Sequence, residues 1–232
     1  MTLTADKILE YGARLMIIFM VLPIHEYAHA FAAYKLGDNT AMYKGRLTMN
    51  PLAHVDPFGA LCLFLTGFGW AKPVPINPMK FKNQRAGMCI SAAAGPLSNL
   101  FVAYLATIAY RVMFALSPKY SLETIMNYYK GEGWLHYTLL FLSFFISINI
   151  GLFIFNLIPI PPLDGSKIIS YFTSVKYDMM MQRYQMQISF LFIILLITGI
   201  LETPLRFLSG KAWDFLYWST GYVDKIVEAI IR

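Results

Sequence analysis

The sequence is poor in charged residues and in cysteine. Of its 232 residues, 14% are Asp, Glu, Lys or Arg, whereas soluble domains average about 25%. Hydrophobic residues make up 57%, so too little polar side chain remains to coat a water-soluble globule. The same apolar content excludes a disordered chain. The two cysteines, Cys62 and Cys89, exclude a disulfide scaffold and are not spaced as a CxxC pair. The composition therefore predicts an integral membrane protein in contact with a lipid bilayer.

The cations are distributed unevenly along the chain. The formal net charge is +6, but no basic run is interleaved with aromatics, so no nucleic-acid partner is expected. Segments 35–86 and 163–185 carry an excess of Lys and Arg, whereas the charges of segment 117–134 balance. Cytoplasmic loops of membrane proteins carry such an excess. We therefore place 35–86 and 163–185 in the cytoplasm and 117–134 outside.

Four apolar stretches are candidates to cross about 30 Å of hydrocarbon. They lie at about 8–34, 87–116, 135–158 and 186–203. A fifth stretch, 58–70, is too short to cross and contains three glycines, so we expect a re-entrant element. These patterns predict an all-α polytopic membrane protein in which 1–203 form one membrane-embedded domain. The tail, 204–232, mixes aromatics with charges and is expected to be an amphipathic interfacial segment.

The first span contains an HExxH sequence, His25-Glu26-Tyr27-Ala28-His29. Histidines at i and i+4 share one face of a helix, so both imidazoles can reach one ion. Catalytic zinc takes three protein ligands and a water. Glu26 can lie beside the metal without binding it, where it can accept a proton from that water. Ionisable residues inside a span are costly, which favours a functional site over a chance pattern.

Asp164 is the candidate for the third ligand. It follows three prolines in Asn156-Leu-Ile-Pro-Ile-Pro-Pro-Leu-Asp164-Gly165, where regular helix is prevented. Taken alone, this stretch fits an ordinary loop with a solvated Asp164 equally well. The predicted topology favours a ligand, because His25, His29 and Asp164 then lie at cytoplasmic ends of parallel spans.

Three motifs in order resemble the site-2 protease family of intramembrane zinc metalloproteases. They are HEYAH, then GPLSN at 95–99, then NLIPIPPLDG at 156–165, and NPLAHVDPFG and GWAKPVPINP also resemble its compact bacterial members. The resemblance covers about 25–175. Two features depart from better-known members: Ser166 replaces a frequent second glycine, and no stretch resembles a PDZ or CBS domain.

The resemblance implies a three-helix catalytic core and one Zn²⁺ per chain, bound by His25, His29 and Asp164. It implies Glu26 as general base and a membrane-anchored protein as the substrate, cut in or near its transmembrane segment. It also implies a bacterial inner (cell) membrane location, with the active site near the cytoplasmic side.

Three further polar residues each have two possible roles. Asn156 suits hydrogen bonding to an extended substrate backbone or capping of a broken helix. Asn99 suits a polar contact to substrate in the cavity or helix packing. His54 is a candidate gate or auxiliary ligand, or a surface histidine. The role of Asn149 stays open.

Two other functions are weaker candidates. A CAAX prenyl protease type would need a downstream Glu ligand, but the available ones lie outside or in the tail (Glu123, Glu132, Glu202 and Glu228). A non-catalytic membrane zinc-binding or transport protein would not need the unligated Glu26.

Overall fold

The computed structural model describes residues 5–66, 69–116, 124, 126, 128, 130, 131 and 133–231. Within these residues the chain is helical, with one isolated β-bridge and no strand. The helices are α1 (Ala5–Met16), η1 (Ile17–Val21), α2 (Leu22–Lys35), α3 (Thr40–Tyr43), α4 (Pro51–His54), α5 (Pro57–Thr66), η2 (Pro78–Lys80), α6 (Gln84–Ala115), α8 (Gly133–Asn156), α9 (Asp164–Phe172), α10 (Val175–Arg183), α11 (Gln185–Ile197), α12 (Glu202–Ser219) and α13 (Tyr222–Ile231). The predicted all-α class is confirmed. The outer segment 117–134, with Glu123 and Glu132, lies largely outside the described residues.

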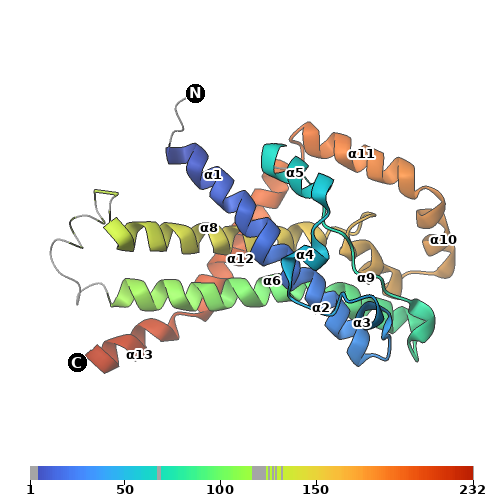
Figure 1. The fold of residues 1–232 in the computed structure, drawn as a ribbon, viewed down its shortest axis with the longest axis horizontal. Coiled ribbons are helices and arrows are strands. Elements are labelled where there is room, and N and C mark those ends of the chain that lie inside the picture. Colours follow the sequence, from blue (N-terminus) through green and yellow to red (C-terminus); the bar gives the residue numbers. More distant parts are fainter. Residues whose placement is uncertain are drawn as a thin grey trace.

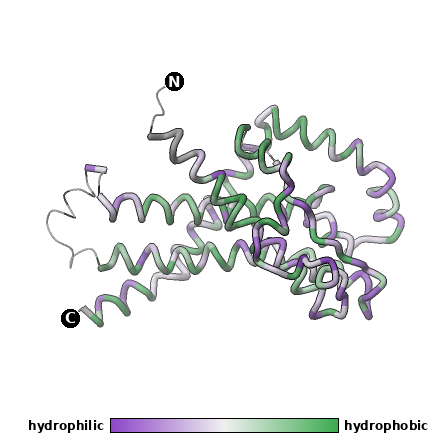
Figure 2. Tube along the Cα trace, viewed as in Figure 1, coloured by the Kyte–Doolittle hydropathy of each residue, from purple (hydrophilic) through white to green (hydrophobic). Residues whose placement is uncertain are grey.

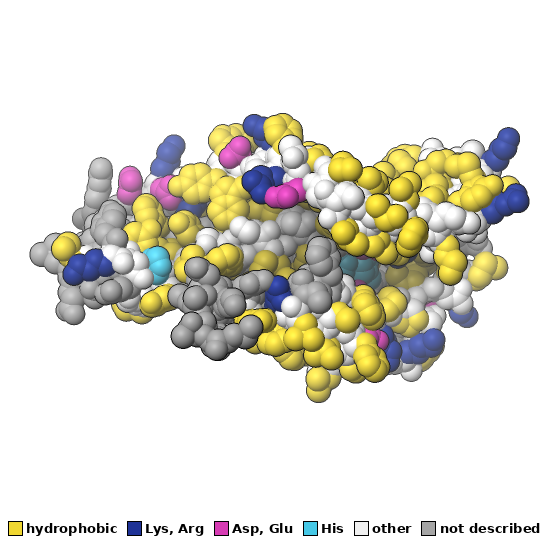
Figure 3. Space-filling model, turned by 90° about the horizontal axis from the view of Figure 1, so that it is seen from above, with side chains coloured by type: hydrophobic (Ala, Val, Ile, Leu, Met, Phe, Trp, Pro, Cys, Tyr) yellow, Lys and Arg dark blue, Asp and Glu magenta, His cyan; other side chains and the backbone are white. Residues whose placement is uncertain are grey.

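Three helical segments among the described residues are long and apolar enough to cross a membrane. They are Tyr11–Lys35, Gln84–Ala115 and Gly133–Asn156, which confirms the three predicted core spans. The helices α6 and α8 lie side by side and antiparallel, and the first span crosses them, with α1 against α8 and α2 against α6 (Figure 1). Apolar residues follow the middle of the bundle, whereas polar residues gather where α2, α6 and α9 meet (Figure 2). Apolar side chains also cover much of the face in Figure 3, as lipid contact requires.

A π-helical turn, η1, precedes the helix that carries HExxH. Pro23 follows it and has no N–H to complete the α-helical hydrogen bonding of this turn. The N–H of Leu22 instead donates to the carbonyl of Ile17, five residues back. The wider turn lets α1 and α2 continue as one span despite the proline. Such π turns occur often at functional sites.

The apolar core lies between α6 and α8. Ala103 and Ala106 of α6 are buried against Ile146 and Ile150 of α8, and Val21 of η1 closes the cluster. Small residues let membrane helices approach closely, since packing rather than the hydrophobic effect holds such helices together. This close contact fixes the relative positions of α6 and α8 on which the site depends.

The segment predicted to be re-entrant returns to its starting point. α5 runs out from Pro57 to Thr66, residues 67 and 68 are outside the described part, and the chain comes back to Ala71. There Val55 and Ala71 form an antiparallel bridge, and the N–H of Lys72 donates to the carbonyl of His54 over 2.8 Å. The two ends of the excursion are therefore adjacent, as a same-side entry and exit requires.

The fourth predicted span is shorter than its apolar stretch suggests. α11 ends at Ile197, and it reaches spanning length only together with α10, from which it is bent by 70°. Its apolar side chains are mostly exposed, and it touches the end of α8 through Phe192 and Phe155 (ring centroids 5.8 Å apart).

The C-terminal helices pack on the bundle through a buried arginine. α12 crosses α8 and α6, with Leu216 in the core, and α13 lies along the far end of α6 (Figure 1). Arg111 of α6 donates to Thr220 Oγ1 (3.0 Å), to the carbonyl of Tyr217 and to Asp224. Its guanidinium also stacks 3.7 Å from the centre of the Tyr217 ring. The expectation that 204–232 lies in the membrane interface stays a prediction.

We predict that Asp224→Ala lowers the free energy of unfolding by about 1–2 kcal/mol. This is the low end for a hydrogen bond between charged groups, because the Asp224 side chain is 43% exposed whereas Arg111 is buried. The matched control is Asp214→Ala on α12, whose side chain is 73% exposed and lies 3.9 Å from Lys211. It should change stability by less than about 0.5 kcal/mol. Thermal unfolding in detergent measures both, and equal effects would contradict the arginine anchor.

Candidate metal centre

The two histidines of HExxH lie on one face of α2, as their spacing predicts. His25 and His29 are both buried, and their Nε2 atoms are 3.0 Å apart. Their rings stand almost perpendicular to one another, at an interplanar angle of 85°. Both Nε2 atoms therefore converge on one point beside α2.

The helix α6 fits against these imidazoles through three positions spaced by four residues. Ser91 and Asn99 are in contact with the histidines, and Gly95 lies between them on the same face. A Cβ atom at position 95 would come within 2.3 Å of His29 Nε2 and 2.7 Å of His25 Cε1. Glycine at position 95 therefore leaves room for the imidazole rings of His25 and His29.

Hydrogen bonds from Nδ1 fix the orientation of both rings. His29 Nδ1 donates to the backbone carbonyl of Ser91 over 2.7 Å, and His25 Nδ1 donates to Asn99 Oδ1 over 2.6 Å. A ring that donates through Nδ1 and is neutral keeps an unprotonated Nε2. Second partners of this kind are typical of metal-binding histidines.

Asp164 reaches the histidines from the start of α9. α8 ends at Asn156, the proline-rich turn breaks the helix, and α9 begins at Asp164 itself. Gly165 lets this turn fold tightly, since a Cβ there would lie 2.4 Å from the carbonyl oxygens of Leu157 and Ile158. Ser166, the departure from the family pattern, donates its hydroxyl to the carbonyl of Leu163. The local chain thus aims the Asp164 carboxylate sideways at α2.

The three predicted ligands form a nearly regular triangle. Asp164 Oδ2 lies 3.3 Å from His25 Nε2 and 3.0 Å from His29 Nε2. Tetrahedral zinc with bonds of about 2.0–2.1 Å separates its ligand atoms by about 3.3 Å. Three lone-pair atoms at such distances repel one another unless a cation lies among them, either protons or a metal ion. One metal ion satisfies all three atoms together, so the donor set fits zinc.

The Asp164 carboxyl is held in its anionic form. Burial by itself would raise its pKa, but hydrogen bonding to His25 and His29, which requires a proton on each Nε2 when no metal ion is bound there, and the nearby charge of Lys167 outweigh burial. The pKa of Asp164 therefore lies well below its ordinary range. Lys167 Nζ is 3.2 Å from Oδ1, the oxygen that faces away from the histidines. Asp164 thus offers a single oxygen, Oδ2, to the site.

Glu26 is beside the triangle but not part of it. Among the described residues, the group able to hold a metal consists of His25, His29 and Asp164. Glu26 is half-buried, and its Oε2 accepts a hydrogen bond from the N–H of Val74 over 3.0 Å. A carboxylate held near the ligands and outside their set matches the place of a general base.

An extended segment, residues 71–77, supplies that N–H and is called here the strap. Pro73 and Pro75 flank Val74 and have no N–H, so the strap offers Glu26 one donor at this point. Arg46 donates to the carbonyls of Lys72 and Pro73, both at 3.2 Å. The buried Asp38 accepts from the N–H of Asn77 over 2.6 Å. The strap is therefore pinned on both sides of its contact with Glu26.

His54 holds the strap rather than lying on the surface. Its side chain is buried, with Nε2 donating to the carbonyl of Thr48 over 2.7 Å, and its own carbonyl bonds Lys72. The alternative of a surface histidine is therefore wrong. His54 does not belong to the group of three that could hold a metal among the described residues.

The two asparagines singled out in the sequence lie in different surroundings. Asn99 is fully buried, and both ends of its amide are engaged, one by His25 and one by Asn149. Asn156 is half-buried at the end of α8, where its Nδ2 donates to the carbonyl of Leu152 over 3.0 Å.

Some contacts of the site had no signal in the sequence analysis. The carbonyl of Ser91 and the N–H of Val74 are backbone groups, and residue type does not predict which side chains such groups bond. Lys167 could have been noticed three residues after Asp164, a spacing that brings side chains together on a helix. The clash at Gly95 follows from the helix crossing alone.

Comparison with known proteins agrees with this geometry. The family model described as "Peptidase family M50" matches residues 13–199. A Bacillus subtilis (strain 168) protein named "Putative zinc metalloprotease YwhC" is 37% identical over 232 residues, 98% of each chain. No solved structure matches the chain.

Two mycobacterial relatives match over a shorter length. A protein of Mycolicibacterium smegmatis named "Putative zinc metalloprotease Rip2" is 28% identical over 151 residues, 63% of this chain and 51% of that protein. A protein of the same name from Mycobacterium tuberculosis (strain H37Rv) is 28% identical over 169 residues, 70% of this chain and 59% of that one. The extent of the family match and the full-length relative decide the assignment. The chain belongs to peptidase family M50, the site-2 proteases, and is an integral membrane zinc metalloprotease.

Proposed function

We propose that this protein hydrolyses a peptide bond in or near the transmembrane segment of a membrane-anchored protein substrate. The observation that carries the proposal is the convergence of His25, His29 and Asp164 between spanning helices, with Glu26 beside them. These three residues hold one zinc ion, and Glu26 is the general base. A site bordered by the spanning helices α2 and α6 is accessible to substrates that are themselves in the membrane.

The residues of the site divide the chemistry between them. Bound zinc supplies a Lewis acid for the scissile carbonyl and lowers the pKa of its water toward about 7. Glu26 accepts the proton of the attacking water and passes it to the leaving amine nitrogen. The N–H of Val74 holds Glu26 in place by bonding Oε2, which leaves Oε1 to take the proton. The amide of Asn156 bonds the backbone of a substrate held extended, since a helical peptide bond is shielded.

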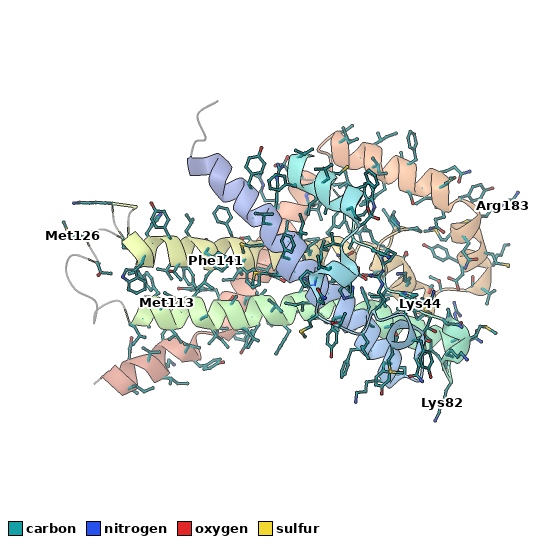
Figure 4. All side chains as sticks on the ribbon, in the orientation of Figure 1. Lys44, Lys82, Met113, Met126, Phe141 and Arg183 are labelled. Atoms are coloured by element: carbon teal, nitrogen blue, oxygen red, sulfur yellow. The ribbon has the colours of Figure 1, made fainter. Side chains whose placement is uncertain are left out.

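The active site lies near the cytoplasmic side of a bacterial cell membrane in this proposal. Lys44, Lys82 and Arg183 lie at one end of the molecule, and Met113 and Met126 lie at the other (Figure 4). The two cation-rich segments therefore share one end, which the positive-inside rule assigns to the cytoplasm. The proline turn and α9 are at this same end (Figure 1). The matched relatives named above come from bacteria.

We predict that Glu26→Gln abolishes peptide cleavage but leaves zinc bound. The amide keeps the size of the side chain and cannot accept the water proton. Cleavage of a model transmembrane substrate in detergent or liposomes and metal analysis of the same sample measure both effects. A residual rate within tenfold of wild type would remove Glu26 from the role of general base. Lost zinc in this variant would show that Glu26 is a ligand.

Asp164→Ala should lose bound zinc, since two imidazoles alone make an incomplete site. Metal analysis of the purified variant beside wild type tests this, with Asp214→Ala as the control because its carboxylate is exposed on α12. We expect about one zinc per chain in wild type and in the control, and less than about a fifth of that in Asp164→Ala. Unchanged zinc in Asp164→Ala would overturn the ligand assignment.

Gly95→Ala should weaken zinc binding at least tenfold, about the cost of losing a partner behind a metal ligand. The added methyl group would overlap the His25 and His29 rings, which their Nδ1 hydrogen bonds keep from moving aside. Gly151→Ala on α8 is the matched control, because a Cβ there meets nothing within 4 Å. Chelator competition measures the affinity of both. Equal affinities would show that the rings have room to move.

A further inference from the structure

Two buried asparagines lie between His25 and the backbone of α8. Asn99 of α6 is 0% exposed and Asn149 of α8 is 1% exposed, and they face each other where α6 packs against α8. Asn99 Nδ2 is 3.1 Å from Asn149 Oδ1, and Asn149 Nδ2 is 2.8 Å from the carbonyl of Phe145. A buried amide costs free energy unless it is hydrogen-bonded, so a pair at this depth calls for a reason.

The carbonyl of Phe145 fixes the direction of every bond in this chain of hydrogen bonds. A backbone carbonyl only accepts, so Asn149 must turn its NH₂ group toward Phe145 and its oxygen toward Asn99. Asn99 must then turn its NH₂ group toward Asn149 and its oxygen toward His25. His25 Nδ1, 2.6 Å from that oxygen, must therefore carry a proton. Neither amide can be turned around without placing two like groups face to face.

We propose that Asn99 and Asn149 are positioning residues that hold His25 in the tautomer able to bind zinc. With the proton fixed on Nδ1, the lone pair of a neutral ring is on Nε2, which faces His29 and Asp164. The inference rests on the proposed role of His25 as a ligand. It gives Asn99 a different task from contact with substrate, since its side chain is fully buried and its amide is engaged by His25 and Asn149.

The two histidines differ in how their tautomers are set. His29 donates to the backbone carbonyl of Ser91, which no substitution at position 91 removes. His25 depends on side chains, and the second of these, Asn149, bonds Asn99 and the carbonyl of Phe145 rather than the metal ligands themselves. Replacing Asn149 frees the Asn99 amide to rotate and present its NH₂ group to His25. His25 then favours a proton on Nε2, where it blocks metal binding.

The decisive test is therefore a change at position 149. Asn149→Leu replaces the amide with an apolar side chain of similar size. Asn149→Asp is the conservative rescue, because a buried carboxyl group stays protonated and can donate to Phe145 and accept from Asn99 as the amide does. Thr107→Val is the control on α6. Thr107 is also buried, and its hydroxyl donates to the carbonyl of Ala103 in its own helix, over 2.8 Å.

Zinc affinity of the full-length protein in detergent is measured by chelator competition, and the visible absorption of the Co²⁺-loaded protein reports the ligand geometry. We expect Asn149→Leu and Asn99→Leu to weaken zinc binding about 10- to 100-fold and to alter the Co²⁺ spectrum. Asn149→Asp should stay within about threefold of wild type, and Thr107→Val should equal it.

Wild-type affinity and spectrum in Asn149→Leu would overturn the inference, as would equal losses in Asn149→Leu and Asn149→Asp. Asn149→Ala removes the same amide without adding a branched side chain, and it takes the place of Asn149→Leu if that variant does not fold. Failure of the wild type itself to bind zinc would instead contradict the proposed function. The two ideas are therefore distinguishable in one set of measurements.

Discussion

The structure depends on the convergence of three lone-pair atoms where the spanning helices α2 and α6 meet the start of α9. His25 Nε2, His29 Nε2 and Asp164 Oδ2 are 3.0–3.3 Å apart. Such atoms repel each other, and the apolar surroundings of spanning helices strengthen the repulsion. A cation has to offset it. The site is therefore an arrangement that the fold enforces and a divalent metal ion stabilises.

The helix α6 provides most of that enforcement. One of its faces carries a backbone carbonyl for His29, a gap for both imidazoles at Gly95 and an amide for His25. Farther along α6, its contacts with Ile146 and Ile150 of α8 are tight because Ala103 and Ala106 have small side chains. Arg85 at the start of α6 donates to the carbonyl of Thr173 over 2.6 Å and to Asp178 over 2.7 Å. It thereby holds α9, the helix that begins with Asp164.

The strap, residues 71–77, connects the loop segments around α4 and α5 to Glu26, the proposed general base. Its single N–H between two prolines bonds Glu26, and Arg46 and Asp38 hold it from either side. The excursion that contains α5 leaves and returns next to the strap, at the bridge between Val55 and Ala71. The loops on this side of the membrane are therefore mechanically linked to the proposed general base.

The sequence by itself determined the features that depend on local periodicity and composition. The three core spans follow from unbroken apolar length, the shared face of His25 and His29 follows from helical spacing, and the break before Asp164 follows from its prolines. The bend between α10 and α11 escaped prediction because apolar length does not show where a helix changes direction.

Only the tertiary structure decided which groups surround those residues. The buried states of His54 and Arg111, the contact of Gly95 with both rings and the path from Phe145 to His25 arise between segments far apart in the chain. Residue types at these positions fit other roles equally well, such as a surface histidine or a cation near the membrane surface. Helix crossings set which atoms meet, and a crossing is fixed by packing along its whole length rather than by any local pattern.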